Sequence, residues 1–237
     1  MTAEASGRVE GTSDRAAHAP VRVWDLPTRL FHWLLVILVS VNLYTGFLGG
    51  LREMDLHMQS GYAILALVLF RLLWGVIGSA RSRFADFVRG PRAVLAYARG
   101  LMRGQGSESV GHNPLGGWSV MALLLVLAVQ ATTGLFSNDD IFTEGPLAKL
   151  VSKATSDMLT SVHDAGVRVL IALIVLHLAA VAFYWLAKGQ NLIRPMITGR
   201  KRPGEAPVAA DQPFAPLWRA GLATAVAAAA VWAIVSL

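Results

Sequence analysis

Five stretches of this chain are apolar over the length that a helix needs to cross a membrane, which is about 20 residues. Charged residues make up only 15% of the 237 residues, whereas soluble domains average about 25%. We therefore predict an all-α membrane protein rather than a disordered chain or a soluble enzyme. The predicted spans are Leu30–Gly49, His57–Gly78, Leu115–Phe136, Val162–Leu186 and Leu217–Leu237.

The basic residues are concentrated on one side of these spans. The segments before the first span, between the second and third and between the fourth and fifth hold 15 of the 21 lysines and arginines, and Arg219 at the start of the fifth span adds a sixteenth on the same side. The positive-inside rule then places the N-terminus in the cytoplasm and the C-terminus in the periplasm of a bacterial inner membrane. Topology and anionic membrane lipid explain the net charge of +6, and no nucleic-acid partner is expected.

The composition divides the chain into four parts. We expect a disordered cytoplasmic tail over residues 1–20, because this stretch is polar and poor in aromatic residues. A four-helix domain follows over 21–190, and it includes a predicted amphipathic surface helix over 84–102. Residues 191–216 are predicted to be a cytoplasmic linker, and 217–237 an additional transmembrane helix.

Four of the six histidines lie in or at the edge of the spans, where ionisable residues are rare and indicate function. His163 and His177 are 14 residues apart, which puts them on one face of one helix at a separation of about 21 Å. His32 matches the depth of His177, and His57 matches that of His163. Two facing pairs of neutral imidazoles are what bis-histidine ligation of two haems requires.

The same histidines are compatible with two alternative roles. Any one of them could form a structural hydrogen bond between helices. A haem-free transporter or metal carrier could bind its cargo with the same residues. The absence of cysteine excludes disulfides, cysteine-ligated iron–sulfur clusters and covalent haem attachment. Gly46, Gly61, Gly75 and Gly166 share the histidine faces and are predicted to leave room for a macrocycle, although ordinary helix packing also uses glycine.

Two arginines lie within the spans and are candidates for binding haem propionates, because a buried guanidinium pairs bidentately with a carboxylate. Arg71 is 14 residues after His57, on the same face at the depth of His32 and His177. Arg168 lies five residues after His163. The alternatives are snorkelling to the membrane surface for Arg71 and an interhelical hydrogen bond for Arg168.

Several polar residues outside the membrane core have weaker candidate roles. His112, just before the third span, could contact a propionate or a quinone head group, or be an ordinary loop histidine. Asp164 or His112 could supply a protonatable group near a quinone. Asp139 and Asp140 could steer a basic partner such as a cytochrome c, or simply face solvent. No role is predicted for His18 in the tail.

Four parts of the sequence resemble the bacterial cytochrome b-561 and nickel-iron hydrogenase cytochrome b family. They are Val23–Trp33 (VWDLPTRLFHW), Phe70–Ser79 (FRLLWGVIGS), Gly111–Trp118 and the pair His163 and His177. The resemblance covers about residues 21–190. It implies a four-helix transmembrane bundle holding two b-type haems, and the fifth helix is an addition to that pattern.

The resemblance also assigns the ligands and the partners. It implies that His32 and His177 bind the iron of an inner haem, and that His57 and His163 bind that of an outer haem. Members of the family pass electrons between quinone and a partner such as a hydrogenase or a soluble cytochrome. The leading hypothesis is therefore transmembrane electron transfer between the quinone pool and a redox protein. A stand-alone quinone-linked oxidoreductase acting on a small molecule such as superoxide is the alternative, so whether the chain is itself an enzyme stays open.

Overall fold

The computed structural model describes residues 20–105, 109–202 and 212–237. Five helices in this part of the chain are long and apolar enough to cross a membrane, which confirms the predicted all-α membrane fold. The predicted tail over 1–19, His18 within it and residues 203–211 of the predicted linker lie outside the described residues. The five helices are α2 (Leu26–Leu48), α3 (Leu51–Ile77), α6 (Pro114–Gly134), α7 (Lys153–Lys188) and α9 (Leu217–Val235).

Three of these helices, α2, α6 and α7, begin where a capping side chain accepts a main-chain N–H group of the first turn. Asp25 caps α2 and Asn113 caps α6, and a proline lies in the first turn of each helix. Ser152 caps α7, which therefore starts well before the predicted span at Val162. Helices α3 and α7 both extend beyond the predicted apolar spans at their N-termini, because their first turns are polar.

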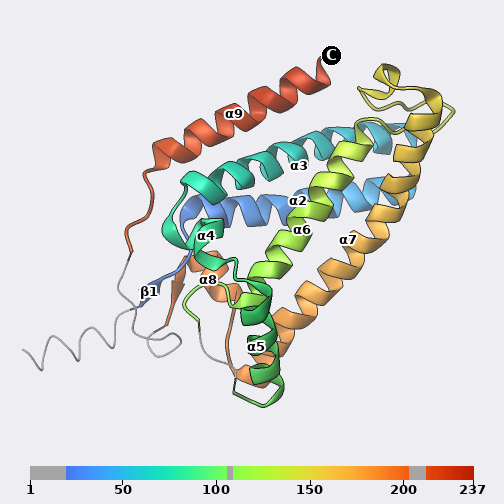
Figure 1. Cartoon of the computed structure of the whole chain (residues 1–237). Helices are drawn as coiled ribbons and strands as arrows, with labels where there is room; N and C mark the ends of the chain where they lie inside the picture. Colours follow the sequence, from blue (N-terminus) through green and yellow to red (C-terminus); the bar gives the residue numbers. More distant parts are fainter. Residues whose placement is uncertain (1–19, 106–108, 203–211) are drawn as a thin grey trace, which may run out of the picture.

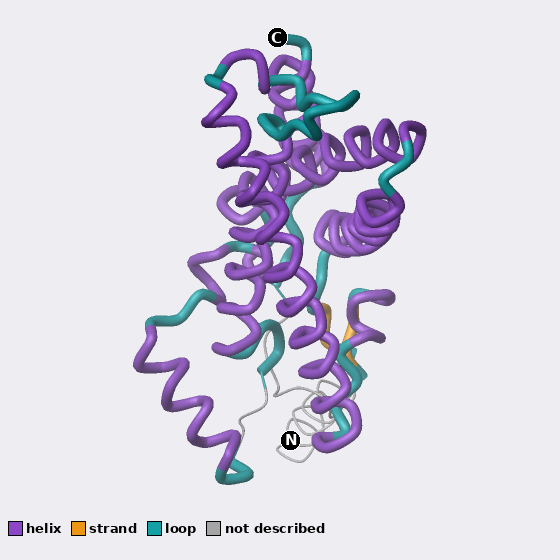
Figure 2. Tube along the Cα trace, turned by 90° about the vertical axis from the view of Figure 1, so that its right-hand side faces the viewer, coloured by secondary structure: helices purple, strands orange, loops and turns teal. Residues whose placement is uncertain are grey.

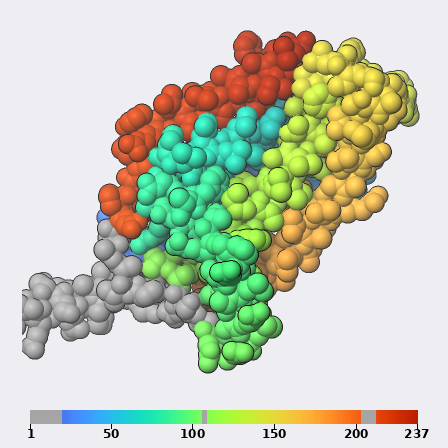
Figure 3. All heavy atoms as spheres, viewed as in Figure 1, coloured from blue at the N-terminus to red at the C-terminus, as the bar shows by residue number. Residues whose placement is uncertain are grey.

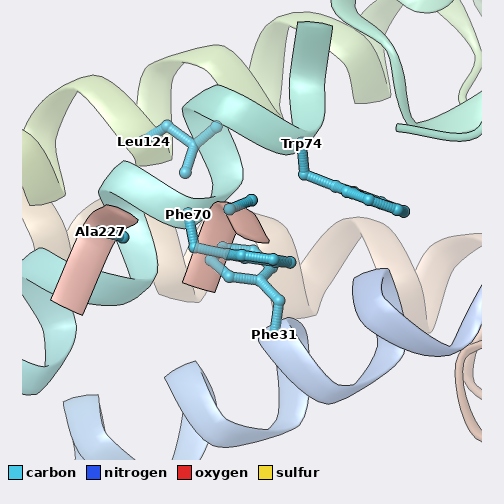
Figure 4. Close-up of a cluster of buried hydrophobic side chains, with 6 residues drawn as sticks. Phe31, Phe70, Trp74, Leu124 and Ala227 are labelled. Atoms are coloured by element: carbon cyan, nitrogen blue, oxygen red, sulfur yellow. The ribbon is translucent and has the colours of Figure 1, made fainter. Parts of the chain in front are cut away.

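The helices pack side by side in the order α2, α3, α6 and α7 (Figure 1). The fifth helix, α9, lies along α3, as the space-filling view also shows (Figure 3). One hydrophobic cluster joins α2, α3, α6 and α9 (Figure 4). Its labelled members are Phe31, Phe70, Trp74, Leu124 and Ala227.

The contact face of α9 consists of small residues spaced four apart. Ala223, Ala227 and Val231 are buried there, and small side chains let two helices approach closely in a membrane. Val231 packs in a cluster with Tyr62 and Leu69 of α3. At about 100° per residue these two side chains point away from His57. The additional helix therefore packs against a different side of α3 from the one that carries His57, although Tyr62 in this cluster also lines the cavity described below.

The segment after α7 folds back onto the start of α2. Strand β1 (Val21–Arg22) pairs antiparallel with β2 (Arg200–Lys201) near the end of the bundle opposite the C-terminus (Figure 2). Helix α8 (Ile193–Thr198) precedes β2, and the Trp33 indole Nε1 donates to its Met196 carbonyl over 3.1 Å. The predicted linker therefore starts with an ordered helix and strand.

The connection between α3 and α6 contains three short helices: η1 (Ala80–Ser82), α4 (Phe84–Phe87) and α5 (Pro91–Met102). The predicted surface helix over 84–102 is thus two helices. Pro91 begins the second one, because its fixed φ suits a first turn and its ring does not fit a helix interior. A further single turn, η2 (Ala148–Leu150), lies between α6 and α7.

Candidate haem sites

His57 of α3 and His163 of α7 face each other across the bundle. Their ring centroids are 6.1 Å apart and their planes are inclined by 80°. A metal–imidazole bond is about 2 Å long, so this separation leaves room for one metal ion between the two rings. We call these two residues the outer pair, and His32 with His177 the inner pair, after the predicted orientation.

Each ring of the outer pair is fixed by a main-chain carbonyl of a neighbouring helix. The Nδ1 atom of His57 lies 2.9 Å from the Asn42 carbonyl oxygen, and that of His163 lies 2.9 Å from the Gln130 carbonyl oxygen. A carbonyl can only accept, so both rings carry their proton on Nδ1. This leaves both Nε2 atoms as lone-pair donors, which is the tautomer that a metal-ligating histidine needs.

A cavity of about 580 Å³ opens beside the outer pair, within the size range of small-molecule and cofactor sites. His57 and His163 both line it, and most of the remaining lining is apolar. Arg168 and Asp164 also line this cavity, which places the predicted Arg168 beside the outer pair. The arrangement fits a flat, largely apolar cofactor with an iron ion held between two imidazoles.

The glycines make room mainly for the outer histidines and their partners. A Cβ on Gly46 would lie 2.9 Å from the His57 ring, and one on Gly134 would lie 3.0 Å from the His163 ring. Gly61 and Gly166 face the side-chain amides of Asn42 and Gln130. The fourth predicted glycine, Gly75, accommodates the Phe84 ring, so it does not face a macrocycle as expected.

The inner pair brings His32 of α2 near His177 of α7, within range for their charges to interact. The Nδ1 of His32 is buried and has no hydrogen-bond partner among the described residues. His112 also lies close to His177, and it packs between Trp24 and Phe87, with ring centroids 4.6 and 4.5 Å away. Imidazole and aromatic side chains therefore gather at this end of the bundle.

Arg71 is buried at the level of the inner pair, with 2% of its surface exposed. Its guanidinium lies over Phe84 at 4.9 Å and over Phe87 at 5.8 Å, and its Nη1 has no hydrogen-bond partner among the described residues. This position excludes snorkelling. A buried cation with a free donor fits a carboxylate ligand such as a haem propionate.

Burial holds His112 in its neutral form. Desolvation between the two aromatic rings is the main cause, and the nearby charges of Arg71 and His177 add to it, so the pKa of His112 falls to about 3. The residue is thus a packed, uncharged imidazole at neutral pH rather than an ordinary loop histidine.

The predicted acidic residues near the outer end are engaged within their own loop. One carboxylate oxygen of Asp139 accepts the N–H groups of Ile141, Phe142 and Thr143, at 2.8 to 2.9 Å. Asp140 forms an ion pair with Lys153 at 2.5 Å. Their charge is therefore partly satisfied inside the loop.

Asn42 and Gln130 are site residues that the sequence reasoning missed. Both side chains line the cavity, and each bonds to one histidine of the outer pair. A usable signal was present, because each residue is followed by threonine three positions later and by glycine four positions later. The pattern is short and lies in apolar helices. It can therefore be recognised as significant only once the hydrogen bonds to the two histidines are known.

Comparison with known proteins identifies the relatives of the chain. The prokaryotic cytochrome b561 family matches residues 23–199. A probable Ni/Fe-hydrogenase B-type cytochrome subunit of Bradyrhizobium diazoefficiens is 24% identical, over 85% of this chain and 92% of the relative. Similarly described proteins are 23% identical in Azotobacter chroococcum (76% of this chain, 87% of the relative) and 22% in Escherichia coli K12 (47% and 57%).

No solved structure matches significantly. The family match covers well over half of the chain and includes all four histidines of the two pairs. Together with the five membrane-spanning helices, it shows a multi-pass membrane protein that transfers electrons through b-type haem. The chain therefore belongs to the prokaryotic cytochrome b561 family.

Proposed function

We propose that this protein carries electrons across a bacterial inner membrane through two b-type haems, one in each histidine pair. The observation that carries the proposal is the outer pair itself. Two histidines on different helices have their Nδ1 atoms bound to main-chain carbonyls, and both rings border a cavity of about 580 Å³. When bound, haem supplies a one-electron couple, and the histidines and the surrounding burial tune its potential.

The inner pair supports a second haem. His32 lies on α2 and His177 on α7, and the buried guanidinium of Arg71 is available to a propionate at their level. A carboxylate there would satisfy the free Nη1 of Arg71, which otherwise remains a costly unpaired donor. Arg168 lines the outer cavity, where it would bind a propionate of the outer haem.

The proposed partners are the quinone pool and a redox protein. The relatives are described as hydrogenase cytochrome subunits, which favours a hydrogenase as the partner over a soluble cytochrome c. The acidic residues Asp139 and Asp140 are bound within their loop, so they give little support to electrostatic steering of a basic partner. The quinone is expected at one haem edge, with His112 or Asp164 as the nearby polar group.

The decisive experiment is a reduced-minus-oxidised spectrum of the purified protein, with haem quantified per chain. We expect two b-type haems, and we expect His32→Ala and His57→Ala each to remove a different one. Gln59→Met, on the exposed surface of α3, is the control and should retain both. Folded wild-type protein without haem would overturn the proposal.

Electron transfer to each partner is tested separately. Wild-type protein in vesicles, reduced by the cognate hydrogenase under H2, should be reoxidised by a quinone analogue only when both haems are present. A variant that lacks one haem yet transfers electrons at the wild-type rate would contradict the path through both haems.

A further inference from the structure

A short pattern occurs twice, once in α2 and once in α6. An amide residue is followed by threonine at the third position and by glycine at the fourth. Four residues make about one helical turn, so the three residues of each set lie on one side of the helix. The two sets are Asn42, Thr45 and Gly46, and Gln130, Thr133 and Gly134.

The two amide residues make equivalent contacts with the outer pair. The side-chain amide of Asn42 donates to the His57 main-chain carbonyl at 2.8 Å, and that of Gln130 donates to the His163 carbonyl at 3.0 Å. In return, each histidine Nδ1 donates to the main-chain carbonyl of the same amide residue. Each histidine is thus held by two reciprocal hydrogen bonds, one to its ring and one to its backbone.

The rest of each set is similar, except that the Thr133 hydroxyl also lies 3.3 Å from the His163 Nδ1. Thr45 and Thr133 both return their hydroxyl groups to their own helix, at 2.8 Å from the carbonyls of Val41 and Val129. The glycines that follow them allow the rings to approach the helix, since a Cβ there would lie 2.9 or 3.0 Å from the ring.

The partner helices repeat the match. Gly61 on α3 lies beside the Asn42 amide, and Gly166 on α7 lies beside the Gln130 amide. The helix pairs α2–α3 and α6–α7 therefore surround the outer cavity as two similar halves. The similarity does not extend to the inner pair, because the His32 Nδ1 has no partner among the described residues.

We propose that Asn42 and Gln130 are matched positioning residues that set the ring planes of His57 and His163 and thereby tune the outer haem alone. The inference rests on the proposed function and extends it. A carbonyl that accepts the imidazole N–H fixes the ring and raises the basicity of the ligating nitrogen. The side-chain amide binds the main-chain carbonyl of the histidine and so ties the two helices together at this point. The helix that carries the histidine is therefore held against rotation, and the ring keeps its orientation. The Gln130 amide oxygen is buried and has no hydrogen-bond partner among the described residues, whereas its N–H donates to the His163 carbonyl. We therefore assign the positioning role to the N–H of this side chain.

The test replaces each amide by an apolar side chain of similar shape in the full-length protein: Asn42→Leu and Gln130→Met. Gln59→Met removes an exposed amide two residues from His57 and is the matched control. A redox titration gives the potential of each haem, and EPR of the oxidised haems reports the angle between axial imidazole planes. Both variants should change the haem that His57→Ala removes, leave the other unchanged and retain the outer haem about 10- to 100-fold less tightly.

If an apolar variant fails to accumulate, Asn42→Ala and Gln130→Ala remove the same amide donors without filling their space and keep the test decisive. A further pair of variants asks whether displacing the two rings alters the same haem. Gly46→Ala and Gly134→Ala push a methyl group towards the two rings, while Ala favours the helix. Gly221→Ala, where no atom lies within 4 Å of the new Cβ, is their control. Both should change the EPR signal of the outer haem, and the control should not.

The outcomes separate this proposal from the one on which it rests. Wild-type protein without haem overturns the proposed function. Wild-type protein with two haems overturns only the positioning role if the variants of Asn42 and Gln130 leave the outer haem's potential and EPR signal unchanged, whatever the glycine variants do. A change confined to the inner haem would overturn it as well.

Discussion

The indole Nε1 of Trp74 donates a hydrogen bond to the carboxylate of Asp25, 3.1 Å away, and so joins the end of α3 to the cap of α2. Both side chains are buried, and the same carboxylate accepts the Thr28 N–H at 2.8 Å and the Ser82 hydroxyl at 3.1 Å. Two of the four stretches that resemble the family, Val23–Trp33 and Phe70–Ser79, are thus in direct contact. This contact sets where α2, with His32, begins beside α3.

Replacing Asp25 should therefore destabilise the bundle. Asp25→Ala removes a helix cap and leaves the buried indole N–H of Trp74 without its acceptor, so the free energy of unfolding should fall by about 2 kcal/mol or more. Thermal unfolding in detergent measures the change. Asp86→Ala, an exposed acid paired with Arg83, is the control and should cost less than about 1 kcal/mol. Equal losses in the two variants would show that the buried network contributes nothing.

Arg71 should act on the inner haem only. Arg71→Gln removes the buried charge that we assign to a propionate, so the inner haem should bind about 2 kcal/mol more weakly. Haem retention during dilution, followed by the spectrum, measures this change. Arg52→Gln, exposed at the other end of α3, should leave both haems in place. Loss of the outer haem in Arg71→Gln would contradict the assignment.

Helix α9 should contribute to stability without affecting the haems. Ala227→Leu adds bulk to its buried contact with α3, which typically costs about 1–3 kcal/mol. The haem spectrum should not change, because Ala227 packs in the cluster of Phe70 and Trp74, and neither of these residues lines the outer cavity. Val226→Leu adds bulk on the exposed side and should leave unfolding unaltered. An altered haem potential in Ala227→Leu would show that α9 reaches the site.

The loop between α6 and α7 should loosen in acid. Three main-chain N–H groups stabilise the ionised Asp139, which lowers its pKa from 3.8 to about 2. Because the folded value is the lower one, the contribution to stability is complete above about pH 4 and is lost as the pH falls towards about 2. The protection of the Ile141, Phe142 and Thr143 amides, measured as their exchange rate relative to the intrinsic rate at the same pH, should fall over that interval. In Asp139→Ala these amides should be unprotected at every pH, so retained protection in that variant would contradict the role of the carboxylate.

The helix count and the spacing of the histidines were predictable from the sequence. A run of about 20 apolar residues has one stable form in a bilayer, because every backbone group must be satisfied within the segment. The periodicity of a helix then puts His163 and His177 on one face. The structure places His57 beside His163, while the ligand roles of the four histidines stay predictions.

The contacts of the site were not predictable in the same way. The Nδ1 partner of His57 lies 15 residues away, and that of His163 lies 33 residues away in another helix. The linker after residue 190 gave no signal for its pairing with β1, because a two-residue strand is too short to show a period. The sequence also did not predict which side of α3 packs against α9, because α9 has apolar residues on every face.

The sequence by itself determined that the chain crosses a membrane five times and carries four histidines at two depths, because length, charge and helical period are local properties. Only the tertiary structure decided that Asn42 and Gln130 bind the outer histidines and that α9 packs against α3. Those relationships depend on how neighbouring helices are rotated and how closely they approach. Small residues such as Gly46 and Gly134 set that approach, and their effect appears only once the helices are side by side.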